Sequence, residues 1–145
     1  RFKKSINKDK TGNMNNLESL RLQENQLTSL PESIGNLASL TELWLHHNQL
    51  ISLPNEITAL SSLEFLWLHY NYLETIPENI GDLTNLQSIN LEHNQLGLAG
   101  SIPESICTFF KENGDAKITF NIDNNLDNIP SQFQGQYPKK EVATV

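Results

Sequence analysis

The four histidines of this sequence, His46, His47, His69 and His93, occur at spacings that invite a chemical interpretation. His46 precedes His69 by 23 residues, and Glu92 follows His69 by the same interval. Two imidazoles and a carboxylate could bind a metal ion, or the carboxylate could orient a histidine acting as a general base. Whether either chemistry is plausible depends on the residues around them.

The surrounding residues favour neither metal binding nor catalysis. A structural zinc site normally holds four ligands, often with cysteines, whereas these ligands would come from three separate segments with no closing loop. No Ser, Thr or Cys is placed beside the histidines as a nucleophile, and no glycine-rich phosphate loop or dinucleotide fingerprint occurs. We therefore expect no catalytic residue, no metal and no cofactor, and a protein that is not an enzyme.

The interval of 23 residues is a period that runs through much of the chain. Leucine, asparagine and Leu/Ile-Pro positions recur at it, for example Leu17, Leu40, Leu63 and Leu86; Leu22, Leu45, Leu68 and Leu91; Asn25, Asn48, Asn71 and Asn94; and Pro31, Pro54 and Pro77. The resulting pattern, L-x-x-L-x-L-x-x-N-x-L-x-x-L-P-x-x-I-G-x-L, resembles the leucine-rich repeat family, whose period is about 20–29 residues. Its length is similar to the typical bacterial class and to the Ras-suppressor-like class.

The resemblance implies an α/β solenoid: a right-handed leucine-rich-repeat horseshoe segment of about five repeats, with a parallel β-sheet on the concave face and short helical or 3-10 turns on the convex face. Packing physics supports such stacking, because one unit cannot bury its own apolar side. Leucines two apart, such as Leu43 and Leu45, then point inward, and the asparagine columns pair with backbone groups. Proline should take the first helical position of the convex turns, with an acid beside it; these acids are Glu32, Glu78 and Glu104.

The repeat pattern also divides the chain. We expect residues 1–11 to be an N-terminal flank or partial capping repeat, residues 12–133 to be the repeat domain and residues 134–145 to be a tail. Repeats start near residues 17, 40, 63 and 86, a three-residue insertion lies within LGLAGS, and a degenerate fifth repeat spans about 110–133. Since the chain begins with Arg and its first unit looks partial, we expect a piece of a longer protein that can associate end to end.

The charge distribution narrows the range of partners. The net charge is −7, and between Leu22 and Phe110 there are ten acids and no Lys or Arg, which disfavours nucleic acid and favours a basic partner. No apolar run reaches the ~20 residues of a membrane helix, and no signal-peptide pattern is present. The single cysteine, Cys107, cannot form an internal disulfide. The compartment stays open between cytoplasm and bacterial secretion or surface display, with disulfide-stabilised extracellular domains disfavoured.

With the leucines inward, the remaining strand positions form columns on the concave face. Adjacent strands lie about 4.8 Å apart, so these columns bring both tryptophans and all four histidines into one patch. The candidate site comprises Trp44, His46, His47, Phe65, Trp67, His69, Tyr70, Tyr72, Glu92 and His93. Exposed apolar patches with polar rims mark binding sites, but stacked rings can also simply shield a sheet.

We predict a non-catalytic module that recognises a protein or peptide through this patch, with Glu24, Glu42 and Glu92 selecting basic groups. Carbohydrate or cell-wall binding is the alternative, because flat aromatic surfaces also stack on sugars. A third alternative is a scaffold segment of a larger signalling protein. Because histidine ordinarily titrates near pH 6.5, we also expect binding to a basic partner to weaken between pH 7.5 and 5.5.

Overall fold

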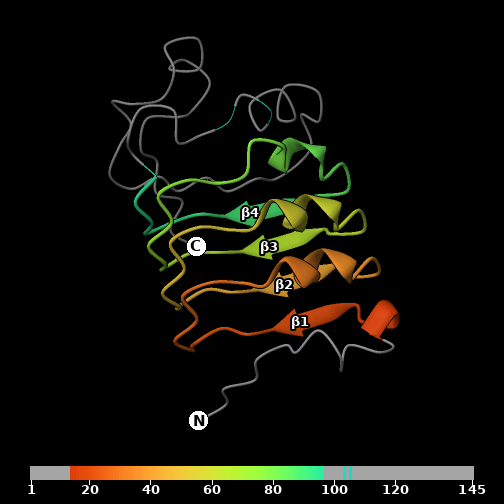
Figure 1. The fold of residues 1–145 in the computed structure, drawn as a ribbon, viewed down its shortest axis with the longest axis horizontal. Helices are drawn as coiled ribbons and strands as arrows, with labels where there is room; N and C mark the ends of the chain where they lie inside the picture. Colours follow the sequence, from red (N-terminus) through yellow and green to blue (C-terminus); the bar gives the residue numbers. More distant parts are fainter. Residues whose placement is uncertain (1–13, 97–102, 104, 106–145) are drawn as a thin grey trace, which may run out of the picture.

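The computed structural model describes residues 14–96, together with residues 103 and 105. These residues form a ladder of short strands joined through 3-10 turns, and the strands follow one another in chain order, β1-β2-β3-β4, in one parallel sheet (Figure 1). The elements are η1 (Met14–Asn16), β1 (Ser19–Arg21), η2 (Glu32–Asn36), β2 (Glu42–Trp44), η3 (Asn55–Ala59), β3 (Phe65–Trp67), η4 (Ile80–Asp82) and β4 (Ser88–Asn90).

The strands pair in the register that the period of 23 predicts. Leu20 pairs with Leu43, Leu43 with Leu66, and Leu66 with Ile89. Trp44 therefore lies directly beside Trp67 on the neighbouring strand. A parallel sheet with short 3-10 turns on the return path is the solenoid expected from the sequence, and the fold class is confirmed. The flank 1–11, the insertion, Cys107, the fifth repeat and the tail lie outside the described residues.

The core is a continuous apolar column between the sheet and the turns. Leu43, Leu45, Leu66 and Leu68 have no exposed surface, so each strand contributes two fully buried leucines. In the first described repeat four leucines are only partly buried and pack against the rest of the core; these are Leu17, Leu20, Leu22 and Leu27. Each repeat thus depends on its neighbours for burial, as a stacked unit should.

The asparagine column forms the predicted amide ladder. Asn71 Oδ1 accepts a hydrogen bond from the Leu50 N–H (3.0 Å), while its Nδ2 donates to the carbonyl oxygens of Leu45 (3.0 Å) and Leu68 (2.9 Å). Asn48 makes the same set of bonds one repeat earlier, and both amides are buried. Because a buried polar group without a partner is costly, this pattern explains why the position takes asparagine.

The convex turns differ from the prediction at their first residue. Pro31 and Pro54 precede η2 and η3 in an extended conformation, with ψ near 149° and 146°, instead of occupying the first helical position. The physical reason is that the Pro31 carbonyl accepts the first turn's hydrogen bond from Ile34 N–H (3.0 Å). Glu32 does open η2, but Glu78 lies before η4, and Glu104 is outside the described residues.

One glycine sets how closely these turns can stack. A Cβ atom added at Gly35 would lie 2.4 Å from the carbonyl oxygen of Glu56 in the next turn. Backbone oxygen cannot move away as a flexible side chain would, so only glycine permits this approach. The glycine in the repeat pattern therefore reports close packing of η2 against η3 and not a conformational requirement.

Candidate partner-binding site

Ring contacts connect eight of the ten predicted site residues, all except Glu92 and Tyr72, and these eight lie at two depths. Trp44, Trp67, His46 and His69 are half-buried, and we call these four residues the inner cluster. His47, Tyr70 and His93 are exposed and follow directly after the inner positions, and we call these three the outer row. Phe65 and Glu92 are also half-buried, whereas Tyr72 is exposed further along the chain.

The inner cluster is held by contacts among its own rings. The Trp44 and Trp67 ring centroids lie 4.1 Å apart at an interplanar angle of 58°. The imidazoles of His46 and His69 stack almost in parallel, with centroids 4.4 Å apart and an angle of 7°. The Arg21 guanidinium carbon lies 4.6 Å from the Trp44 ring centroid, within the range of a cation–π contact. These rings are therefore packed against other side chains of the chain itself, before any partner binds.

Glu42, which we expect to select basic groups of a partner, also makes contacts within the chain. Its Oε2 atom accepts hydrogen bonds from Ser19 Oγ (3.0 Å) and Trp44 Nε1 (3.3 Å). The same oxygen lies 3.7 Å from Arg21 Nη2 in an ion pair. This carboxylate therefore bonds to the Trp44 indole and pairs with Arg21, so part of its negative charge is compensated within the chain.

Burial lowers the pKa of both inner histidines and so favours their neutral form. Desolvation lowers the pKa of His69 to about 4, helped by repulsion from His46 and His47 and opposed by Glu92. Desolvation, together with His47, also lowers the pKa of His46 against an opposing effect of Glu24. Within the described structure the Nδ1 atoms of both rings are buried and have no hydrogen-bond partner. The expected titration between pH 7.5 and 5.5 is therefore wrong for His69, whose pKa lies below this range, and the pKa of His46 moves in the same direction.

The outer row is a second stack of rings, which meets the inner histidines edge-on: the His47 centroid lies 5.6 Å from that of His46 and 5.9 Å from that of His69. Tyr70 lies between the two histidines, 4.4 Å from the His47 centroid and 4.1 Å from the His93 centroid, at angles of 10° and 14°. Both faces of the Tyr70 ring are therefore covered, yet 45% of the residue is exposed. What it presents to solvent is the ring edge and the hydroxyl group, which suits an amphipathic contact.

An unusual backbone conformation positions the outer row. His47, Tyr70 and His93 have φ angles of 54°, 54° and 51°, and Glu24 in the preceding repeat has 56°. Such left-handed angles are uncommon for residues other than glycine. The ladder nevertheless continues through them, because His47 N–H donates to His69 O (3.1 Å) and Tyr70 N–H donates to Glu92 O (2.9 Å). The sequence carries no glycine or other signal at this column that would have predicted it.

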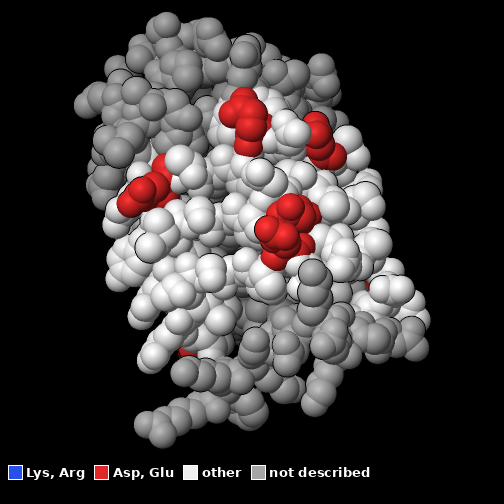
Figure 2. All heavy atoms as spheres, in the orientation of Figure 1, with Lys and Arg blue, Asp and Glu red and all other residues white. Residues whose placement is uncertain are grey.

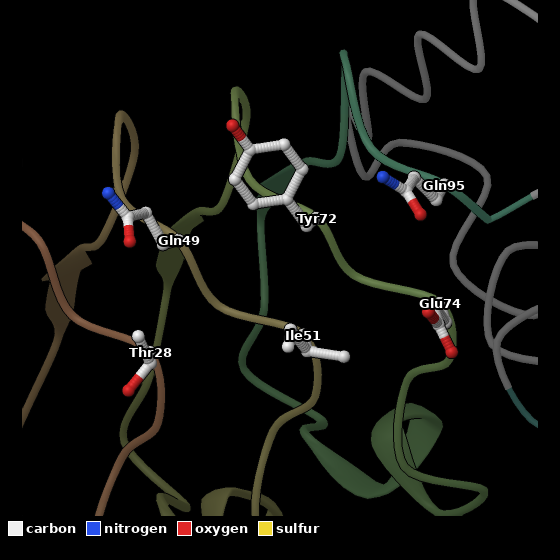
Figure 3. Close-up of a pocket in the computed structure, with 6 residues that line it drawn as sticks. All are labelled: Thr28, Gln49, Ile51, Tyr72, Glu74 and Gln95. Carbon is white, nitrogen blue, oxygen red and sulfur yellow. The ribbon is translucent and has the colours of Figure 1, made fainter.

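A shallow pocket beyond the outer row was missed in the sequence. It has a volume of about 290 Å³, and two rows of side chains from successive repeats line it (Figure 3). We call it the flank pocket; its residues are Thr28, Gln49, Ile51, Tyr72, Glu74 and Gln95. Ile51 and Tyr72 are each 52% exposed. The available signal was Ile51, an apolar residue in a column whose other described members are Thr28 and Glu74.

The described surface is strongly acidic. Figure 2 shows acidic side chains on this view and no basic ones among the described residues. Arg21 is the single basic side chain in residues 14–96, against ten acids: Glu18, Glu24, Glu32, Glu42, Glu56, Glu64, Glu74, Glu78, Asp82 and Glu92. In the same part of the chain no group of three or more His, Cys, Asp or Glu side chains is arranged to hold a metal ion.

The parallel ladder, the buried asparagines and the stacked 3-10 turns define a leucine-rich repeat solenoid. A family model described as a leucine-rich repeat region matches residues 1–108, so the chain belongs to the leucine-rich repeat family. Leucine-rich repeats are in general protein-interaction modules and typically are not enzymes. Among the described residues, no helix has the length and apolar character needed to cross a membrane.

Solved structures give the same result. A leucine-rich repeat protein of Leptospira interrogans is 36% identical and aligns with a TM-score of 0.60. The alignment covers 72% of this chain but only 25% of that protein, so this chain spans about a quarter of its relative's length. No curated protein matches the sequence. Because 81 solved chains match, the fold is common and does not by itself select a partner.

Proposed function

We propose that this chain recognises a protein or peptide partner through its concave face, with the outer row as the primary contact. The observation that carries the proposal is the stack of His47, Tyr70 and His93, in which Tyr70 remains 45% exposed between two histidines. Tyrosine contributes much of the binding energy in many protein interfaces. A ring already fixed on both faces also loses little conformational freedom when a partner binds.

The inner cluster would form the floor of this surface. Trp44 and Trp67 are half-buried and contact each other, and Phe65 lies 6.4 Å from the Trp67 centroid in an edge-on arrangement. The inner histidines, whose pKa values are lowered by burial, add a polar surface next to them. A partner segment lying across the repeats would therefore meet a wide apolar floor and a raised aromatic edge.

Charge favours a basic partner. Residues 14–96 hold ten acids and one arginine, and that arginine is paired with Glu42. A surface with this field raises the association rate of basic partners and repels acidic ones. Carbohydrate binding is less favoured at the outer row, since sugar stacking requires an open ring face and both faces of Tyr70 are covered.

Selection from a random peptide display library on the immobilised full chain tests the proposal. The affinity of a selected peptide is then measured by calorimetry for wild type, Tyr70→Ala, Trp44→Ala with Trp67→Ala, and Glu56→Ala. Tyr70→Ala should weaken binding about 30-fold, as expected for a hot-spot residue worth ~2 kcal/mol. Glu56→Ala removes an exposed acid from η3 on the convex face and should have little effect.

Two outcomes would contradict the proposal. In the first, the selected peptides lose affinity with Glu56→Ala and keep it with both concave variants, which places binding on the convex face. In the second, no peptide is enriched while a glycan array gives a saturable signal that is lost in Tyr70→Ala. The second outcome would establish the carbohydrate alternative. Circular dichroism of each variant confirms that lost binding does not reflect lost fold.

A further inference from the structure

The flank pocket combines a small apolar surface with one carboxylate. In Figure 3, Tyr72 stands between Gln49 and Gln95, with Ile51 below it and Glu74 at one side. Ile51 and Tyr72 are the apolar members, and each is 52% exposed. Glu74 supplies the negative charge, and the two glutamine amides supply hydrogen-bonding oxygens.

We infer that the flank pocket is a subsite for one lysine or arginine side chain of the partner. Both side chains have a long apolar stem and a charged head. The stem would pack on Ile51 and the Tyr72 ring, and the head would reach the Glu74 carboxylate. A guanidinium group has five N–H donors and also favours aromatic faces, so arginine makes the fuller set of contacts.

The size of the pocket fits a single side chain. Its volume of about 290 Å³ lies just below the roughly 300–1,000 Å³ that small-molecule pockets span. An aliphatic side chain could cover Ile51 and Tyr72, but it would leave the Glu74 carboxylate beside it without a counter-charge. A folded surface without a protruding side chain would not fill the pocket. A protruding basic side chain satisfies both conditions.

The backbone holds the pocket residues at fixed spacing. Tyr72 N–H donates to Leu50 O (2.9 Å), Gln95 N–H donates to Leu73 O (2.9 Å), and Glu74 N–H donates to Ile51 O (3.1 Å). The last bond joins the residue that supplies the charge to the residue that supplies the apolar floor. The two chemical elements of the subsite are therefore positioned before a ligand binds, which reduces the entropy that binding costs.

The cation must come from outside the described chain. Arg21 is the only basic side chain in residues 14–96, and it pairs with Glu42 on the first strands of the sheet. None of the six lining residues is basic. The inference deepens the proposed function, on which it rests, because it names a residue type that the partner presents. Its test uses small probes, so that it can fail independently of that function.

The test is an NMR titration of the full chain with capped tripeptides, observing the methyl signals of Ile51 and the ring signals of Tyr72. Acetyl-Gly-Arg-Gly-amide and its lysine analogue should shift both sets of signals saturably. The citrulline analogue has the same shape as arginine without the charge, and the norleucine analogue has only the stem. Both should give shifts too weak to saturate. Added salt should weaken arginine binding, because exposed charges are screened.

Variants separate a specific subsite from general attraction to an acidic protein. Glu74→Gln should weaken arginine binding about two- to fivefold, the range of an exposed ion pair, and the charge-matched convex variant Glu56→Gln should leave it unchanged. The inference is overturned if citrulline or norleucine binds as well as arginine, if Glu56→Gln matches Glu74→Gln, or if no peptide shifts these signals. It is also overturned if methyl glucoside saturates the pocket and arginine does not.

Discussion

The inner cluster and the outer row contain similar residues, one position apart in the chain, and yet they differ in almost every physical property. In a regular strand, His46 and His47 would point to opposite sides of the sheet. Here their rings lie 5.6 Å apart, because His47 adopts a left-handed conformation with φ of 54°. The chain thus places two consecutive side chains on one surface, the first half-buried and the second exposed.

This difference separates rings whose contacts stabilise the fold from rings that a partner can contact. The inner rings contact one another, Arg21 and Glu42, and desolvation lowers the pKa of both their histidines. The outer rings stack along their own row, His47 and Tyr70 also meet the inner histidines edge-on, and all three outer residues are exposed. Two interpretations of the aromatic patch, shielding of the sheet and partner binding, therefore apply to two different depths of the same surface.

The largest expected effect is the loss of stability when the inner indoles are removed. Trp44→Ala with Trp67→Ala should lower the free energy of unfolding by about 2–4 kcal/mol, less than two fully buried rings would lose, because both are half-buried. Tyr70→Ala with Tyr72→Ala should lower it by about 1 kcal/mol or less, since exposed rings contribute little. Urea denaturation measures both. Equal losses would remove the distinction between the two depths.

Acid should weaken the fold through His69. Its folded-state pKa, about 4, is lower than the ordinary value of 6.5, so the unfolded chain binds the proton first. Stability is full above pH 6.5 and falls as the pH decreases towards 4. A fully buried group would lose about 3 kcal/mol over this range, and partial exposure reduces this to on the order of 1–2 kcal/mol. Urea denaturation at a series of pH values measures the slope.

The matched variant for this experiment is His46→Gln with His69→Gln, which keeps polar side chains but cannot titrate in this range. Its stability should change less than that of wild type between pH 6.5 and 4. His47→Gln with His93→Gln provides the comparison from the outer row. The prediction is wrong if the pH dependence of stability disappears in the outer-row variant and persists in the inner-cluster variant.

A smaller effect should reveal the left-handed backbone of the outer row. Tyr70→Gly and Tyr70→Ala both remove the ring, but alanine keeps a Cβ atom in a conformation that costs about 1–2 kcal/mol for residues other than glycine. We expect the glycine variant to be about 1 kcal/mol more stable than the alanine variant, reversing their usual order. Thermal melts of the two variants measure this difference, and a more stable alanine variant would contradict the positive φ.

The smallest expected effect concerns Glu42. Glu42→Gln removes the ion pair with Arg21 and weakens the bond to the Trp44 indole, so stability should fall by about 0.2–1 kcal/mol. The loss should shrink at high salt, because the pair is partly exposed. Glu18→Gln, an exposed acid one residue before β1, is the charge-matched control. An equal effect of both variants would mean that only net charge matters.

The sheet, its register and the amide ladder could be predicted from the sequence because they depend on identical residues recurring at identical spacing. Asn48 and Asn71 are 23 residues apart and make equivalent bonds. The grouping of Trp44, His46, Trp67 and His69 followed from the same arithmetic. A period fixes which residues are neighbours, and for these side chains that was sufficient.

The burial of the individual side chains could not be predicted from the period. His46 and His47 are the same residue type, and only the backbone angle of His47 decides that one is half-buried and the other exposed. The lowered pKa of His69 arises from desolvation by neighbouring strands, which no local pattern records. The flank pocket depends on Ile51 and Glu74 meeting across a repeat boundary through one backbone hydrogen bond. These properties come from packing between repeats.

The asparagine ladder makes the two ends of the solenoid unequal, which affects how the chain can be truncated. Asn71 receives the N–H of Leu50 and donates to the carbonyl of Leu45, so each asparagine completes the repeat that precedes it. Deleting the repeat that contains Asn71 would leave the Leu50 N–H and the Leu45 carbonyl without this partner. Because both are backbone groups, no point mutation can remove them. Deletion of the first described repeat would also remove backbone partners, because Glu18 O accepts from Thr41 N–H (2.8 Å) and Leu27 O accepts from Gln49 N–H (2.9 Å). Shortening from either side therefore exposes backbone groups of the repeat that remains, but only a cut on the C-terminal side also removes the asparagine that completes that repeat.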